Sequence, residues 1–374
     1  MPFRFLATLS KDRTESCNRT LLSLISRQNE QMHNPLISRR SFIRGTIGGV
    51  VGQSLLGTTV QASEMRQVLT VTGQIGRQQL GVALPHEHII CDFIGANQTG
   101  AHRWDRDSVV QRMLPYVDAL KKAGVNSFFD CTPAYIGRDP IILKRLSKET
   151  GLNIVTNTGF YGGANDKYVP AAAYSMSSDK MAARWKREYM DGIEGTGVRP
   201  GFIKIGVDSV PDAEAPLSDI DARIVRAAAK VSRETRLGVT CHTGGGHAGL
   251  AAVKLFIREG GNASSFVVAH ADSHGLDINR KVSDLGAWVS FDAVGRKPMK
   301  LHLKTVPAML SHRPDRLLLS QDNGWYSVGE EEGGKVRGYT DLIQSFLPAL
   351  LAAGVAQKQL QQLVSANPWT AFAI

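Results

Sequence analysis

Short, continuous apolar runs alternate with amphipathic stretches over most of the chain after residue 63. The apolar runs contain Phe-Phe, Val-Val and Leu-Leu-Leu, which is typical of parallel strands buried on both faces. The amphipathic stretches at 107–123, 220–235 and 248–259, and the neighbourhood of Ser283, have apolar residues at helical spacing. We therefore predict eight strands, which fall at 80–90, 127–132, 153–159, 202–208, 238–243, 266–271, 288–294 and 317–322.

Eight strand–helix units over roughly 290 residues indicate an α/β fold of the (β/α)8 TIM-barrel type. A short β-hairpin starting at 68–73 precedes the first unit. An open doubly wound sheet is the alternative, and it is less favoured because no Gly-x-Gly-x-x-Gly motif follows the first strand. We expect residues 63–374 to form one barrel domain, in which the unit between Pro298 and Leu317 has the least regular pattern.

Several predicted strands are closed or interrupted by polar residues that commonly bind metals. Active sites of (β/α)8 barrels lie at the C-terminal strand ends, so these side chains should meet at one mouth. His86 and His88 are two apart and therefore face the same way in a strand. Leaving such groups buried without partners would cost on the order of several kcal/mol each, and two divalent ions would satisfy them. The expected metal ligands are His86, His88, Lys204, His242, His270 and Asp322.

Lys204 is the unusual member of this set, because a lysine among apolar strand residues should point into the barrel. In one interpretation its neutral amine adds carbon dioxide and becomes a carbamate, which turns a cation into an anionic bridging ligand. In the other, the lysine forms a salt bridge with Asp208 or Asp130. The residues alone favour neither interpretation.

Composition and charge are those of a globular protein, with 43% hydrophobic and 21% charged residues. The net charge of +10 is unevenly distributed, because residues 1–62 hold eight Lys/Arg against three Asp/Glu and so contribute half of it. No dense Lys/Arg run with interleaved aromatic residues occurs. We therefore expect no nucleic-acid partner.

The first 62 residues have the pattern of an export signal. Ser38-Arg39-Arg40-Ser41-Phe42 is a twin-arginine motif, and a glycine-rich apolar stretch leads from it to the small-residue cleavage site Val60-Gln61-Ala62. The stretch is too short for stable membrane insertion, which needs about 20 mostly apolar residues. We predict an N-terminal extension with a Tat-type signal peptide, starting at Met1 or Met32, and a periplasmic or secreted product of the Tat export machinery. A cytosolic protein with an unstructured N-terminus is the alternative.

Three cysteines follow residue 62, namely Cys91, Cys131 and Cys241, and no CxxC motif occurs. An odd number of cysteines without close spacing argues against a disulfide framework. Cys91 and Cys131 would pair only if their strands were neighbours in an oxidising compartment. Buried free thiols are the simpler interpretation.

In their order and spacing, the candidate ligands resemble the phosphotriesterase family of the amidohydrolase superfamily. The resemblance covers residues 68–374 and implies that His86, His88 and Asp322 hold the more buried ion. It implies His242 and His270 on the more exposed ion, with a carbamate on Lys204 and a hydroxide as bridges. Zinc is the expected metal, and manganese, cobalt or iron fit the same ligands. The motifs that carry the resemblance are Pro85-His86-Glu87-His88, Gly201-Phe202-Ile203-Lys204, His242-Thr243, Ala269-His270-Ala271-Asp272 and Ser320-Gln321-Asp322.

The resemblance implies a binuclear-metal hydrolase that cleaves a lactone, a carboxylic ester or a phosphotriester. The metal-bridging hydroxide attacks this small-molecule substrate, and Asp322 acts as the catalytic base. Family members are often dimers, which is compatible with a homodimer here. The alternatives are amide hydrolysis at the same centre and a catalytically silent zinc-binding exported protein. A structural zinc site is normally closed by Cys and His ligands, unlike a set containing Asp322 and Lys204.

The chain departs from the organophosphate-degrading members of the family. Those members carry an Asp and a His near the ends of the sixth and seventh strands that relay a proton outward. The corresponding positions here are Ser273 and Ala293. Asp272 and His274 are the candidates to replace this relay.

The chain also departs from the members that hydrolyse quorum-sensing lactones. Their aromatic residue after Thr-Gly on the third strand is matched by Tyr161, but their Arg-Tyr-Gly is replaced by Ala293-Val294-Gly295. Trp325 lies on the loop after the last strand, where aromatic residues commonly line an apolar pocket. We expect Tyr161 and Trp325 to bind the substrate. The alternative for the aromatic residues of the last loop is that they pack this loop against the barrel. We expect the remaining histidines singled out in the barrel to lie on the surface, namely His102, His302 and His312.

Overall fold

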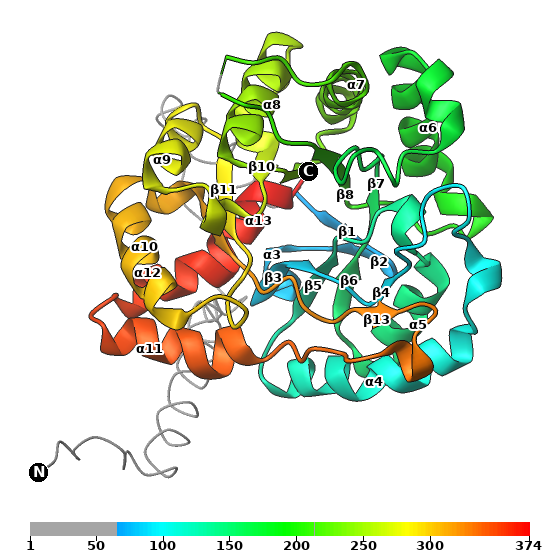
Figure 1. Ribbon diagram of the computed structural model, residues 1–374. Coiled ribbons are helices and arrows are strands. Elements are labelled where there is room, and N and C mark those ends of the chain that lie inside the picture. The colour runs from blue at the N-terminus through cyan, green and yellow to red at the C-terminus, as the bar shows by residue number, and fades with distance from the viewer. Residues whose placement is uncertain (1–65, 213) are drawn as a thin grey trace, which may run out of the picture. The chain divides into compact units, whose positions relative to one another are not determined.

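The computed structural model describes residues 66–212 and 214–374, so the predicted leader at 1–62 lies outside the described residues. Within Gln67–Ile374, which form one compact unit, parallel strands make a TIM barrel surrounded by helices (Figure 1). All eight predicted strands are present, which confirms the (β/α)8 fold. They are β3 (Ala83–Glu87), β5 (Ser127–Asp130), β6 (Asn153–Val155) continued by β7 (Asn157–Thr158), β8 (Phe202–Val207), β9 (Val239–Thr243), β10 (Phe266–Val268), β11 (Trp288–Phe291) and β12 (Leu317–Leu319).

The outer layer contains the predicted helices and several others. Sequence features set their ends: Asp139 accepts hydrogen bonds from the first backbone N–H groups of α5, Pro140 occupies its first turn, and Gly151 ends it in the left-handed region. The helices are α3 (Arg77–Leu80), α4 (Arg106–Lys122), α5 (Pro140–Thr150), α6 (Ser178–Asp191), α7 (Asp219–Thr235), α8 (Gly246–Arg258), α9 (Leu276–Asp284), α10 (Met299–His312), α11 (Leu347–Ala352), α12 (Gln357–Gln361) and α13 (Asn367–Phe372).

The first predicted strand is shorter in the structure and is divided. Gly81, with φ of +52°, separates α3 from β3, and a side chain at this position would collide with Asn126. Strand β3 ends at Glu87. The next strand, β4 (Ile90–Cys91), pairs with β13 (Tyr326–Ser327). The predicted hairpin is confirmed as β1 (Val68–Thr70) and β2 (Gly73–Ile75).

Strand register brings the polar residues of neighbouring strands to the same level. Lys204 lies opposite Thr240 and Gly206 lies opposite His242 in the parallel pairing of β8 with β9. The backbone N–H of Asp322 donates to the carbonyl of His86 at 3.0 Å, which joins the end of β12 to β3. This contact at the C-terminal end of the barrel places residues from the first and last strands side by side.

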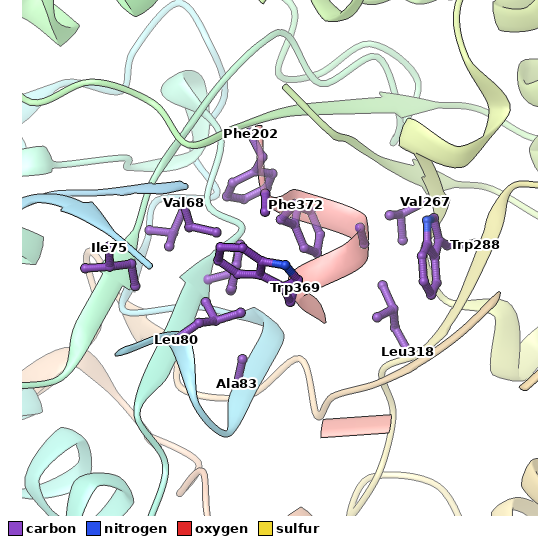
Figure 2. Packing of buried hydrophobic residues seen from close by; sticks show 14 of the residues in the cluster. Val68, Ile75, Leu80, Ala83, Phe202, Val267, Trp288, Leu318, Trp369 and Phe372 are labelled. Carbon is purple, nitrogen blue, oxygen red and sulfur yellow. The ribbon is translucent and has the colours of Figure 1, made fainter. Parts of the chain in front are cut away.

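The N-terminal end of the barrel is filled by apolar side chains from the hairpin and from the last helix. Figure 2 shows Trp369 and Phe372 of α13 among strand residues and Val68 of β1. The Phe372 ring centroid lies 4.5 Å from that of Phe129 and 5.8 Å from that of Phe202. Each such side chain stabilises the fold by roughly 1.5–3 kcal/mol when fully buried. Substrate must therefore enter at the opposite, C-terminal end.

Two further predictions concern the described part of the chain. Cys91, Cys131 and Cys241 are buried free thiols, as the simpler interpretation of their spacing required. Within residues 66–212 and 214–374, none of the helices combines the length and the apolarity needed to cross a membrane.

Candidate metal centre

The six predicted ligands come together at the C-terminal end of the barrel. They line a single cavity of about 320 Å³. Three of them lie on strands, and the other three follow the ends of β3, β10 and β12. The strand residues are His86, Lys204 and His242, and the residues that follow strands are His88, His270 and Asp322.

His86, His88 and Asp322 form the tightest group, with one donor atom of each lying within 4.8 Å of the others. Nε2 of His88 is 3.0 Å and Nε2 of His86 is 3.8 Å from Oδ1 of Asp322. Nδ1 of His88 is hydrogen-bonded to Oγ1 of Thr132 at 2.8 Å, so Nε2 is left to bind a cation. Two imidazole nitrogens and a carboxylate oxygen are a suitable donor set for zinc and its neighbours.

Lys204 is buried beside this group, with Nζ 3.2 Å from Nε2 of His86. In the part of the chain that the structure describes, it forms an ion pair with neither of the two aspartates considered as partners. Asp130 accepts backbone hydrogen bonds instead, and Asp208 accepts one from the backbone of Asn165. The salt-bridge interpretation of Lys204 is therefore wrong, while the carbamate stays a prediction.

His242 and His270 form the second group. Their ring centroids are 4.6 Å apart, and the His270 ring is 5.1 Å from the His86 ring, so the two groups are adjacent. His270 has a φ of +58°, in the left-handed region that residues other than glycine rarely adopt. Such strain is often retained at functional sites, because the surrounding structure fixes a residue that must point in one direction.

Asp292 is a functional residue that our sequence analysis missed. It lies directly after β11 and is fully buried, with Oδ2 2.7 Å from Nδ1 of His86 and Oδ1 2.9 Å from Nδ1 of His270. One carboxylate therefore orients an imidazole from each ligand group and leaves both Nε2 atoms facing the cavity. Burial alone would raise the pKa of Asp292, but His270 and His86 hold it well below its usual range.

The pKa shifts of His86, His242 and Asp322 suit metal binding. Burial, assisted by the nearby Lys204, lowers the pKa of His86 to about 3. Burial and the neighbouring His270 lower the pKa of His242 well below its usual value. Burial alone would raise the pKa of Asp322, but the hydrogen bond with His88 and the charge of His86 hold it below its usual range. Neutral imidazoles and an ionised carboxylate are the forms that bind divalent ions.

Glu87, between His86 and His88, holds the loop that carries Asp322. Its Oε1 accepts hydrogen bonds from Oγ of Ser320 at 2.8 Å and from the backbone of Gln321 at 2.9 Å. Its Oε2 accepts one from the backbone of Asn323 at 2.8 Å. Because these donors flank Asp322, which has a φ of +53°, Glu87 fixes the strained backbone of a predicted ligand. Our sequence analysis did not identify this role.

One side of the cavity is aromatic and contains both predicted substrate-binding residues. The ring of Trp325 lies 4.3 Å from that of His88 and 5.3 Å, stacked, from that of Phe93. Nε1 of Trp325 donates to the carbonyl of Asp322 at 2.7 Å. The ring of Tyr161 lies 4.8 Å from that of His242. The structure therefore places Tyr161 and Trp325 against the two ligand groups.

A second part of the cavity lining is cationic, which our sequence analysis did not anticipate. Arg296 and Lys297 follow β11, and both line the cavity. Nη2 of Arg296 lies 2.6 Å from Oδ2 of Asp322, and Nζ of Lys297 donates to Oγ of Ser273. Aromatic and cationic side chains thus both line the cavity that contains the predicted metal ligands.

The prediction that His302 lies on the surface is wrong. Its side chain is 1% exposed and forms an ion pair with Asp272, whose other oxygen accepts the backbone N–H of Asp292 at 2.9 Å. His302 shares a face of α10 with the buried Val306 and Met309, and this spacing was the signal for burial. His102 and His312 are exposed, as expected.

In the described residues, the side chains of both candidates for the missing proton relay already have partners within the protein. Asp272 is engaged by His302, and Nε2 of His274 lies 3.2 Å from Oγ1 of Thr243. Ser273 and Ala293 line the cavity at the positions where the relay would lie. The replacement of the relay by Asp272 or His274 stays a prediction.

Comparisons with known proteins agree with the geometry. The chain matches the model of the phosphotriesterase family over residues 66–372. It is 24% identical to an aryldialkylphosphatase of Saccharolobus solfataricus, over 81% of this chain and 98% of the relative. It is 23% identical to an N-acetyltaurine hydrolase of Xenopus tropicalis, over 82% of this chain and 98% of the relative.

Among solved structures, an organophosphorus hydrolase from Deinococcus radiodurans superimposes with a TM-score of 0.73 at 27% identity, covering 82% of this chain and 96% of that one. The family match spans nearly all of the described barrel, including the six converging side chains at its mouth. The chain therefore belongs to the phosphotriesterase family, whose members are metal-dependent hydrolases.

Proposed function

We propose that the protein is a binuclear metallohydrolase that cleaves an ester bond, either in a lactone or carboxylic ester or in a phosphotriester. The convergence of four histidines, Lys204 and Asp322 on one cavity carries this proposal. We prefer a lactone or carboxylic ester as the natural substrate, because phosphotriesters are rare natural compounds. The relatives named for phosphatase and organophosphorus hydrolase activities support the hydrolysis of esters.

We propose that each of the two groups of side chains binds one ion. His86, His88 and Asp322 would hold one ion, and His242 with His270 would hold the other. Lys204, as a carbamate, would lie between them: its neutral amine attacks carbon dioxide, a proton is released, and a carboxylate remains on Nζ. Zinc is the expected metal, with manganese, cobalt and iron as fitting replacements.

When bound, the two ions supply an activated water and polarise the oxygen of the scissile ester. Asp322 receives the proton of that water as general base, which is consistent with its position beside His88. Asp292 keeps His86 and His270 oriented throughout. Tyr161 and Trp325 position the substrate by packing against its apolar part.

Amide hydrolysis at the same centre is the second candidate. It is favoured by the relative named N-acetyltaurine hydrolase, whose name describes cleavage of an amide. The same residues would act in the same roles, since an amide carbonyl needs the same polarisation and proton transfer. The remaining alternative, a silent zinc-binding protein, predicts bound metal without turnover.

Metal counting and substrate screening test the proposal together. The purified protein should contain about two divalent ions per chain and should hydrolyse lactones, aryl esters or phosphotriesters, with activity removed by a chelator and restored by zinc. One tightly bound ion without turnover would instead support the silent alternative. Removal of carbon dioxide during reconstitution should slow recovery, and added bicarbonate should restore it, if Lys204 is carboxylated.

We also propose that the chain is exported through the Tat pathway into the periplasm or beyond the cell. The twin arginines at Arg39 and Arg40 and the cleavage site ending at Ala62 support this. A reporter fused to residues 1–62 should leave the cytoplasm, and replacement of both arginines by lysine should retain it there. The homodimer stays a prediction, which sedimentation of the mature chain would test.

A further inference from the structure

The cationic part of the cavity contacts one carboxylate, that of Asp322, which already has another predicted role. The only carboxylates that line the cavity in the described chain are Asp272 and Asp322. Asp272 pairs with the buried His302 and accepts the backbone N–H of Asp292. Asp322 is a predicted metal ligand and general base, so its contact with Arg296 cannot be its main function.

Arg296 and Lys297 are held at the cavity by a tight turn after β11. The backbone N–H groups of both residues donate to the carbonyl of Ala293, at 3.1 Å and 2.9 Å. Gly295 occupies this turn with φ of +81°, and a Cβ there would lie 2.6 Å from Oδ2 of Asp341. The two cations are therefore placed by backbone geometry rather than by a salt bridge at the surface.

Exposure and charge suggest what these cations bind. The Arg296 side chain is 30% exposed, so its guanidinium is accessible from the cavity while one nitrogen contacts Asp322. Lys297 donates to a neutral hydroxyl, that of Ser273, and forms no ion pair with a described carboxylate. Guanidinium and ammonium groups in a partly desolvated cavity favour an anionic ligand, and guanidinium matches a carboxylate or phosphate with two parallel hydrogen bonds.

We propose that Arg296 and Lys297 form an anion subsite, and that the natural substrate is an ester, lactone or amide bearing a negatively charged group close to the scissile bond. This inference rests on the proposed hydrolytic function and specifies its substrate class. The anionic group lies near the bond to be cleaved, because Arg296 contacts the carboxylate proposed as general base. The apolar remainder of the substrate packs against Trp325 and Phe93, which line the same cavity.

The test compares charged and neutral versions of one substrate in the metal-loaded protein. A γ-butyrolactone carrying a carboxylate on the ring is assayed beside the corresponding carboxamide, which has the same shape without the charge. A third lactone carries a phosphomethyl group and distinguishes a phosphate from a carboxylate as the preferred anion. We expect either anionic lactone to have the higher kcat/KM, whereas a preference for the carboxamide would overturn the proposal.

Variants separate substrate binding from an effect on Asp322. In Arg296→Gln the ratio of kcat/KM for the anionic lactone to that for the carboxamide should fall about 10- to 100-fold, mainly through KM. Arg296→Lys should recover part of the ratio, and Lys297→Gln should lower it less. Arg233→Gln is the matched control, because Arg233 lies at the C-terminal end of α7, away from the barrel mouth. An equal loss for both lactones in Arg296→Gln would show that Arg296 only positions Asp322, and would refute the subsite.

Binding measured without turnover keeps this inference separate from the proposed reaction. The lactam 2-pyrrolidone-5-carboxylate and its carboxamide resemble the lactones but are stable, so their affinities can be compared by calorimetry. Tighter binding of the carboxylate that disappears in Arg296→Gln supports the subsite even if no lactone is hydrolysed. Hydrolysis of lactones with equal binding of the two lactams would leave the proposed function standing and overturn the anion subsite.

Discussion

The two ends of the barrel are built from the same strands but serve opposite purposes. At the N-terminal end, Phe129, Phe202 and Phe372 are in ring contact within an apolar cluster, and nothing there requires a ligand. At the C-terminal end, the same or neighbouring strands present buried histidines, a lysine and aspartates. The comparison teaches that one end supplies stability, while the other holds polar groups whose burial is offset by hydrogen bonds and would be offset further by the proposed ions.

A substitution at the mouth should remove activity and leave the fold intact. Asp322→Asn is expected to lower kcat about 100- to 10,000-fold, because the general base is lost. Urea denaturation should give nearly the unfolding free energy of the parent protein. Asp315→Asn, which changes a half-exposed carboxylate paired with Arg313, is the control and should retain its activity. Near-normal turnover in Asp322→Asn would refute the assignment of the base.

A substitution at the opposite end should do the reverse. Phe372→Ala is expected to reduce the free energy of unfolding by about 3–5 kcal/mol, through lost burial and the cavity left behind. Phe93→Ala is the matched change at the mouth, where the side chain is 40% exposed, and it should cost less than about 1 kcal/mol. Equal destabilisation by the two substitutions, measured in urea, would contradict the division between the ends.

Glu87→Gln sharpens the comparison, because Glu87 gives structural support to the mouth. An amide cannot accept all the hydrogen bonds from Ser320, Gln321 and Asn323, so a buried donor should be left unsatisfied at a cost of about 1–3 kcal/mol. Zinc affinity should fall as well, since the loop that carries Asp322 would loosen. Glu149→Gln on the exposed face of α5 is the control. Unchanged stability and zinc affinity would show that Glu87 does not hold this loop.

Acid should destabilise the metal-free protein because a histidine at the mouth of the barrel, rather than any group at the apolar end, is protonated on unfolding. His86 has a pKa lowered from 6.5 to about 3, so between these pH values the unfolded state binds the proton and the folded state does not. Stability is therefore lost as pH falls through this window, by at most about 1.4 kcal/mol per pH unit for one group. His86→Asn should flatten the dependence measured by urea denaturation, and His312→Asn, at the exposed end of α10, should not.

Much of the fold could be predicted because the strands are continuous apolar runs. In addition, only a few known architectures are compatible with strand–helix alternation of this length. The ends of elements were less predictable. Leu317–Leu319 form β12, but the predicted strand reached Asp322. The strand ends earlier because the left-handed backbone of Asp322 lies in a loop that Glu87, from the first strand, holds by hydrogen bonds. Local sequence carries no record of such distant hydrogen bonds.

The ligands could be predicted because each interrupts or ends an apolar strand, whereas their supporting residues were harder to recognise. Asp292 ends the seventh apolar run just as Asp322 ends the eighth, so a signal for it existed. His302 was misassigned because its helix is only moderately amphipathic, and its partner Asp272 lies in a different βα loop. The contact of Arg296 with Asp322 depends on how two loops meet, which spacing along the chain does not determine.

Crystals of the zinc-loaded protein, examined by anomalous scattering at the zinc edge, would test the central claim most directly. We expect two peaks at the C-terminal end of the barrel, one beside His86, His88 and Asp322 and the other beside His242 and His270. Electron density for a carbamate on Lys204 should lie between them. A single peak, or peaks away from these six side chains, would contradict the account.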